Sequence, residues 1–193
     1  IVIKNGIDLE RFKYCDIYRD EVRRNHGIAS DEIVIGHVGR FDIVKNQSFL
    51  IEIFESYQKI NPHSRLVCVG TGATINNIKE LVARKGLVNK VIFAGLQQDI
   101  HKYLSSFDYF VFPSLYEGLP VALVEAQASG LMIICSNKVS PEARLSNYLS
   151  HFPLENNSEE WANYISNLPI LDREQWIYQL EEKGYNILKT VEF

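Results

Sequence analysis

The sequence has few of the features that mark disulfide-rich, membrane-spanning or nucleic-acid-binding proteins. Its three cysteines, Cys15, Cys68 and Cys135, have no metal-ligand spacing, and the last two fall in apolar runs where a small buried hydrophobe is expected. No apolar run approaches the roughly 20 residues that a membrane-spanning helix needs. The formal charge of -4 shows no basic excess, so we expect no nucleic-acid partner. These absences favour a globular domain in a reduced, cytoplasmic setting.

The histidines are too scattered to form a metal-ligand pattern, so we expect no metal and no other cofactor. His37, on a predicted strand close to Gly39, is expected to be a core residue whose hydrogen bonds are satisfied. What the chain does have is an ordinary globular composition, with 46% hydrophobic and 23% charged residues. Its 193 residues suit one domain with a full core. The five histidines are His26, His37, His63, His101 and His151.

Strands and helices alternate along the chain from Ile33 to Cys135. Runs of β-branched and aromatic residues predict the strands, and apolar residues at helical spacing predict the helices. This alternation requires right-handed crossovers and predicts an α/β fold, a doubly wound parallel sheet of Rossmann type with ligands at the carboxyl ends of the strands. The predicted strands are residues 33–39, 65–70, 90–95, 108–113 and 131–135, and the predicted helices are residues 16–26, 46–60, 75–85 and 99–106.

Beyond Cys135 the pattern is less clear. Ser158 to Trp161 has the acidic residues of a helix start, and residues 172–188 predict a longer amphipathic helix. The aromatic residues of this region are expected to pack in the core rather than to form platforms for sugars. They are Trp161, Tyr164, Trp176 and Tyr178.

Residues 111–134 read as a strand, a tight loop, a helix and a second strand. Pro120 fits the first turn of the helix, and Gly130 is placed to end it. Glu117 lies in the loop, and Glu125 lies one to two turns inside the helix. The free backbone N–H groups at the helix start would bind an anion, and the two carboxylates would accept hydrogen bonds from hydroxyls. A ligand that carries both phosphate and sugar would match this mixture.

A second candidate loop lies between the strand 33–39 and the helix 46–60. It contains Arg40 and Lys45 beside Gly39, which would let the backbone approach a ligand. A diphosphate requires such cations: the planar guanidinium of Arg40 would make a bidentate contact, and the ammonium of Lys45 would act as a mobile point charge. The alternative is that the two cations are a solvated surface pair.

The spacing of Glu117 and Glu125 resembles the signature of retaining glycosyltransferases of the GT-B fold, in the large "glycosyl transferases group 1" family. The resemblance implies that Glu117 faces the donor sugar and that Glu125 binds the ribose hydroxyls of the nucleotide. It implies that the amides between them face the diphosphate, while Arg40 and Lys45 neutralise the leaving group. The alternative is that Glu117 only complements the helix dipole and Glu125 is a solvated helix residue. The residues implied in catalysis are Glu117, Arg40 and Lys45, and those implied in donor binding are Gly39, Gly72, Leu96, Gln97, Gly118, Leu119, Pro120, Val121 and Glu125.

Other loops follow the family less closely. Gly70 and Gly72 form a Gly-x-Gly pair after a strand, which is a weak phosphate-loop signal and equally a plain tight turn. Relatives often carry an acidic residue at the position of Thr71. In the family the base is read near Leu96 and Gln97, largely through backbone groups. Relatives also often have two glycines where this chain has Val139 and Ser140.

The resemblance implies that residues 1–193 are the C-terminal, donor-binding half of a GT-B enzyme. Because the chain begins without Met and stops inside a predicted helix, we expect a fragment that lacks an N-terminal acceptor domain. The expected partners are a nucleotide-diphosphate sugar and a sugar or lipid-linked acceptor, in cell-surface polysaccharide or glycolipid synthesis. The full-length protein would be cytoplasmic, with peripheral contact at the inner face of the membrane. Two alternatives remain: a nucleotide-sugar epimerase of the same fold, and a non-catalytic nucleotide-sugar-binding module.

Overall fold

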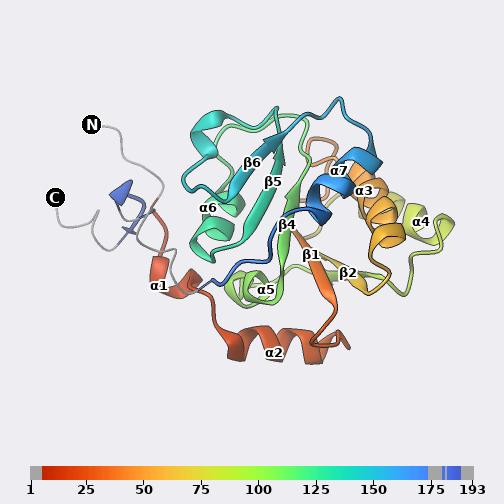
Figure 1. Ribbon diagram of the computed structural model, residues 1–193, viewed down its shortest axis with the longest axis horizontal. Helices are drawn as coiled ribbons and strands as arrows, with labels where there is room; N and C mark the ends of the chain where they lie inside the picture. Colours follow the sequence, from red (N-terminus) through yellow and green to blue (C-terminus); the bar gives the residue numbers. More distant parts are fainter. Residues whose placement is uncertain (1–5, 174–179, 181, 188–193) are drawn as a thin grey trace.

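Six parallel strands form a single sheet in the computed structural model, which describes residues 6–173, 180 and 182–187 (Figure 1). Their spatial order is β3-β2-β1-β4-β5-β6, so the winding direction reverses between β1 and β4. In doubly wound folds this reversal opens a crevice at the carboxyl ends of the strands, where ligands bind. The predicted fold class is therefore confirmed. The strands are β1 (Ile33–Val38), β2 (Ser64–Val69), β3 (Val91–Gly95), β4 (Tyr109–Phe112), β5 (Met132–Ser136) and β6 (Leu149–Phe152).

Helices cover both faces of this sheet (Figure 1). One face packs against α1 (Leu9–Phe12), α2 (Asp16–Asn25), α5 (Ile100–Ser106) and α6 (Val121–Ala128). The other packs against α3 (Gln47–Ile60), α4 (Ile75–Arg84) and α7 (Ser158–Ser166). Successive residues of β4 alternate between the two cores, as the two-residue period of a strand requires: Phe110 and Phe112 lie on the α6 side, Tyr109 and Val111 on the α3 side.

The predicted strands and helices between residues 16 and 106 are found with their ends shifted by at most one residue. Pro120 is a correction, because α6 begins at Val121 and the proline is its N-cap residue rather than part of its first turn. The edge strand β6 was not predicted from the sequence. A capping box of Asn157 and Glu160 begins α7 as expected, and Trp161 is fully buried. Residues 174–179, with Trp176 and Tyr178, and residues 181 and 188 of the predicted helix 172–188 lie outside the described residues. An unbroken helix to residue 188 is wrong, because a turn at residues 183–184 with a left-handed Gly184 and a β-bridge at Asn186 interrupt it.

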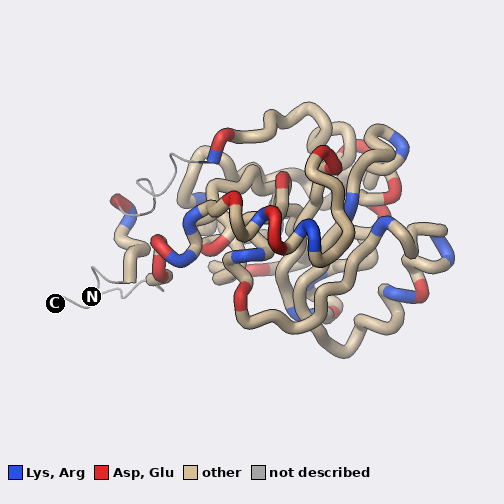
Figure 2. The backbone as a smooth tube through the Cα atoms, turned by 90° about the horizontal axis from the view of Figure 1, so that it is seen from below, with Lys and Arg blue, Asp and Glu red and all other residues tan. Residues whose placement is uncertain are grey.

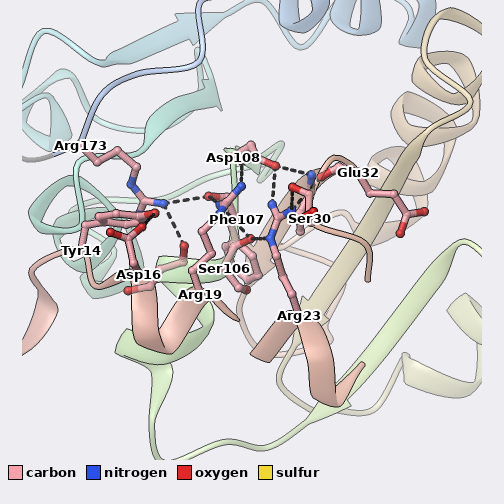
Figure 3. Close-up of polar contacts among 12 residues, drawn as sticks. Tyr14, Asp16, Arg19, Arg23, Ser30, Glu32, Ser106, Phe107, Asp108 and Arg173 are labelled. Carbon is pink, nitrogen blue, oxygen red and sulfur yellow. Dashed lines mark hydrogen bonds and ion pairs between the residues drawn. The ribbon is translucent and has the colours of Figure 1, made fainter. Parts of the chain in front are cut away.

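A buried ion cluster fixes α2 to the amino end of β4 (Figure 3). Asp108 has only 4% of its side chain exposed and accepts hydrogen bonds from Arg19 Nη2, Arg23 Nη2 and the Val34 backbone N–H, each at 2.7 Å. A buried carboxylate is stable only when it is paired and hydrogen-bonded in this way. Because the strands are parallel, this cluster lies at the edge of the sheet opposite their carboxyl ends.

Arg173 ties the chain that follows α7 to the same edge (Figure 3). Its guanidinium donates to the carbonyl oxygens of Leu104 and Phe107, at the end of α5, and of Ser129, at the end of α6, at 2.8 to 2.9 Å. These are carbonyls that a helix leaves unpaired at its C-terminus, where a cation is favourable. Burial nonetheless lowers the pKa of Arg173 to about 9.

Lys and Arg residues are interleaved with Asp and Glu residues along the backbone (Figure 2). Several of them pair between elements, as Lys85 on α4 does with Glu55 on α3 and Lys102 on α5 with Glu21 on α2. Such surface pairs contribute about 0 to 1 kcal/mol each, so burial rather than pairing holds the helices on the sheet. In the part of the chain that the structure describes, no helix has both the length and the apolar character to cross a bilayer.

Candidate active site

A cavity of about 500 Å³ opens at the carboxyl ends of β1, β2 and β3. Its lining brings together five of the residues that the sequence singles out, although they come from three loops: Gly39, Arg40, Gly72, Leu96 and Gln97. Leu96 is 80% exposed, so its side chain projects into solvent instead of capping the core. The cavity lies where a doubly wound sheet binds its ligand.

Glycines allow the loops after β1 and β2 to touch. Gly70 has a φ of +131°, and a Cβ there would lie 2.1 Å from Gly39 O. A Cβ on Gly72 would lie 2.2 Å from Phe41 O. The same loops are joined by a hydrogen bond from Phe41 N to Thr71 O of 3.0 Å. The Gly-x-Gly pair therefore has a packing reason: it brings the backbones that line the cavity into contact.

Lys45 and Glu117, 72 residues apart in sequence, form an ion pair in which the Nζ of Lys45 contacts Oε1 of Glu117. The site of a Cβ on Gly39 is 3.6 Å from Lys45 Cδ, so the pair lies beside the cavity. The Lys45 and Glu117 side chains are 17% and 16% exposed, so Lys45 is not a solvated surface cation, whereas Arg40 is exposed where it lines the cavity. The structure thus brings Arg40, Lys45 and Glu117 to one edge of the sheet.

A hydrogen-bonded contact behind the Arg40 loop, made by Gln47, was not predicted from the sequence. The side chain of Gln47 is buried, and its Nε2 donates to Arg40 O at 2.8 Å and lies 3.4 Å from His37 Nε2. His37 Nδ1 lies 3.0 Å from Val111 O and donates to it, which leaves Nε2 as the acceptor. Burial lowers the pKa of His37 to about 4, so the ring is neutral, and the prediction of a satisfied core histidine is confirmed. The sequence carries no signal for this contact, because a glutamine at a helix start is ordinary.

The start of α6 lies at the same edge of the sheet as the ion pair. Glu117 is four residues before Val121, the first helical residue, and it pairs with Lys45 beside Gly39. Leu123 N donates to Pro120 O at 3.0 Å, whereas the N–H groups of the first two helical residues have no partner within the helix. These N–H groups and the helix dipole favour an anion at this end of α6. Gly118 and Val121 complete the predicted segment, and Val121 is 48% exposed.

Glu125 is not an ordinary solvated helix residue. Burial of its carboxyl raises its pKa to about 7, and the nearby cation of Arg11 acts in the opposite direction. Arg11 Nη2 in turn lies 3.5 Å from Gln98 O and 3.7 Å from an Asp99 carboxylate oxygen. Arg11 thus lies near both Glu125 and the β3–α5 loop, which carries Gln97. Perturbed carboxylates of this kind in a cleft are candidates for a functional role.

The site is rich in groups that bind hydroxyls and phosphates. Among residues 6–173, 180 and 182–187, no three His, Cys, Asp or Glu side chains come close enough to hold a metal ion. The groups at this edge of the sheet are two cations, the amides that begin α6 and the carboxylate of Glu117, with Glu125 farther inside the same helix. Such groups can hold an anion by charge and by backbone hydrogen bonds, and hydroxyls by their carboxylate oxygens.

Comparison with known proteins identifies the family. The sequence profile described as "Glycosyl transferases group 1" matches residues 18–182. The chain belongs to this family. EpsF of Bacillus subtilis (strain 168) is 36% identical over 194 residues, which cover 98% of this chain and 50% of EpsF. The UDP-Gal:alpha-D-GlcNAc-diphosphoundecaprenol alpha-1,3-galactosyltransferase of Escherichia coli is 30% identical over 201 residues, which cover 99% of this chain and 51% of the relative.

Solved structures agree on the fold. HepE from Anabaena, crystallised with UDP and glucose, superposes with a TM-score of 0.81 at 22% identity. The match covers 98% of this chain and 54% of HepE. The chain thus spans about half the length of the relatives that it matches.

Proposed function

We propose that this chain is the donor-binding domain of a retaining glycosyltransferase, which moves a sugar from a nucleotide-diphosphate sugar to an acceptor. The observation that carries the proposal is the Lys45–Glu117 ion pair, which lies beside Gly39 and Arg40 of the cavity lining and joins this loop to the segment just before α6. The half-length match to its relatives supports a second domain in the full-length protein. We take it to be the N-terminal acceptor domain that the family resemblance implies, with residues 1–193 as the C-terminal half.

The donor divides into parts that match different groups of the site. The base and its sugar enter the cavity beside Gly72, Leu96 and Gln97, and Glu125 accepts hydrogen bonds from the ribose hydroxyls. The diphosphate contacts Arg40, Lys45 and the backbone N–H groups of Gly118, Leu119 and Val121; Pro120 has none to offer. Glu117 is left to orient the sugar to be transferred. This division follows the chemistry of the groups: a mostly apolar cavity suits the base, cations and helix amides suit the diphosphate, and carboxylates suit hydroxyls.

Stabilising the leaving group is the main task of the protein in this reaction. Breaking the bond between the anomeric carbon and the phosphate oxygen develops negative charge on the diphosphate and positive charge on the sugar. Two cations and a helix N-terminus, held in place before the reaction, stabilise the first charge without reorganisation. The carboxylate of Glu117 stabilises the second. The diphosphate charge is met by these groups, so no metal is required.

The acceptor belongs to the full-length protein. The Escherichia coli relative acts, by its name, on a sugar linked to diphosphoundecaprenol. We extend this to a sugar or lipid-linked acceptor and to cell-surface polysaccharide or glycolipid synthesis, at the cytoplasmic face of a membrane. The acceptor would be bound mainly by the N-terminal domain.

Two measurements test the proposal. Isothermal calorimetry of this chain with a panel of nucleoside diphosphates and nucleotide sugars should give saturable binding to one base, and Lys45→Ala should weaken that binding. Incubation of the full-length protein with the bound nucleotide sugar, with and without acceptor, should give transfer only when acceptor is present. Epimerised sugar without acceptor would favour an epimerase, and binding with neither hydrolysis nor transfer would favour a non-catalytic module.

A further inference from the structure

Lys45 is held rigidly where it meets Glu117. Its backbone N–H donates to Asp42 Oδ1 at 3.0 Å, and the next residue, Asn46, adopts the left-handed conformation with a φ of 53°. The Asn46 side chain donates to Pro113 O at 3.1 Å, which fixes the loop to the end of β4. Asparagine adopts this conformation more readily than most residues, and its contact with Pro113 holds it there. The backbone that carries Lys45 is therefore fixed to the end of β4, and its ammonium group also lies 4.8 Å from the centroid of the Phe112 ring.

The backbone of Glu117 is fixed from the other side. Its N–H donates to Lys138 O at 3.3 Å, and its carbonyl accepts from Ser140 N at 2.9 Å, so that the loop pairs with the segment after β5. Movement of this loop that separated the Glu117 carboxylate from Lys45 would break both hydrogen bonds. With side chains only 17% and 16% exposed, the ion pair is less screened by water than a surface pair is.

The two ends of this pair need different partners from a ligand. A nucleotide sugar offers both: phosphate oxygens for Lys45 and sugar hydroxyls for Glu117. A nucleoside diphosphate offers phosphate alone, so Glu117 keeps Lys45 as its best partner and competes with the phosphate for it. We propose that Glu117 is a specificity-determining residue that weakens binding of the nucleoside diphosphate product relative to the nucleotide-sugar donor. The inference rests on the proposed function, because it takes the pair to lie in the donor's diphosphate and sugar positions.

The test is the affinity for ligands that have phosphate but no transferable sugar. Calorimetry at pH 8 would measure inorganic pyrophosphate and UDP on the wild type, Glu117→Gln, Lys45→Gln and the double variant. Glu117→Gln should bind both ligands about five-fold more tightly, because Lys45 no longer has a competing partner. In the Lys45→Gln background the same change should have no effect, as a double-mutant cycle requires of a direct coupling. Glu52→Gln, an exposed glutamate on α3, removes the same charge elsewhere and should leave both affinities unchanged.

Thermal melts would verify that the variants fold, and Glu117→Ala, which removes the carboxylate altogether, should give the same tightening. Unchanged or weaker pyrophosphate binding in both Glu117 variants would overturn the inference while leaving the proposed function intact. Tighter pyrophosphate binding on Glu117→Gln that persists in the Lys45→Gln background would also overturn the inference and leave the proposed function intact. A wild-type protein that binds neither nucleoside diphosphates nor nucleotide sugars would overturn both.

Discussion

The ionisation of Glu125 should govern how tightly the domain binds a nucleotide sugar. Burial raises the pKa of this carboxyl to about 7, against the Arg11 cation, so its charge changes near neutral pH. About one-tenth of the carboxyl is ionised at pH 6 and about nine-tenths at pH 8. The ionised form accepts both ribose hydroxyls, whereas the protonated form loses acceptor capacity. The apparent Kd should therefore fall about ten-fold between pH 6 and pH 8.

The assay must avoid ligands that titrate in the same range. The diphosphate of a nucleotide sugar is esterified at both ends, so its charge is constant from pH 6 to pH 8. The terminal phosphate of a nucleoside diphosphate gains or loses a proton in this range. Calorimetry with the nucleotide sugar that binds most tightly in the panel would give Kd at several pH values. Glu125→Gln removes the titrating group and should bind weakly with no pH dependence. A flat profile in the wild type, or the same slope in Glu125→Gln, would refute the reasoning.

The same pKa shift has a consequence for stability with a definite sign. A carboxyl whose pKa is raised from 4.5 to about 7 holds its proton in the folded protein at pH values where the unfolded chain has lost it. The free energy of unfolding therefore falls as the pH rises from about 4.5 to about 7. Thermal melts across this range should show the decline in the wild type and less of it in Glu125→Gln.

Three further predictions follow from other parts of the structure. Arg40→Ala should lower turnover of the full-length enzyme about 100-fold with an unchanged melting temperature. Arg84 is an exposed arginine on α4, and Arg84→Ala should change neither quantity. Wild-type turnover in Arg40→Ala would exclude a leaving-group role for Arg40. Gly72→Ala should impair nucleotide binding, since its Cβ meets Phe41 O at 2.2 Å, and calorimetry showing wild-type affinity would contradict the packing role of the glycine. Asp108→Asn leaves Arg19 and Arg23 without their carboxylate. It should lower the free energy of unfolding by about 3 to 5 kcal/mol and Tm by about 10 °C. Calorimetry below the melting range should show an unchanged affinity for the nucleotide.

Local pattern was enough to predict the strands and helices of the sheet, because their apolar periodicity reports directly which residues face a core. It was also enough to predict that Arg40, Lys45, Glu117 and Glu125 follow strands whose carboxyl ends meet at one edge. The edge strand β6 was not predicted, because its apolar pattern is weak. Its sequence, Leu149-Ser-His-Phe152, is short and half polar, and an edge strand needs less apolar surface than a central one.

What the sequence by itself determined is therefore the fold class, the order of the elements and the set of side chains near the site. Only the tertiary structure decided how these side chains pair: Lys45 with Glu117 across 72 residues, and Gln47 with Arg40 O and His37. It also decided the raised pKa of Glu125, which depends on the burial that neighbouring elements impose. Periodicity describes one element at a time, whereas pairing distances and desolvation depend on how elements pack against one another.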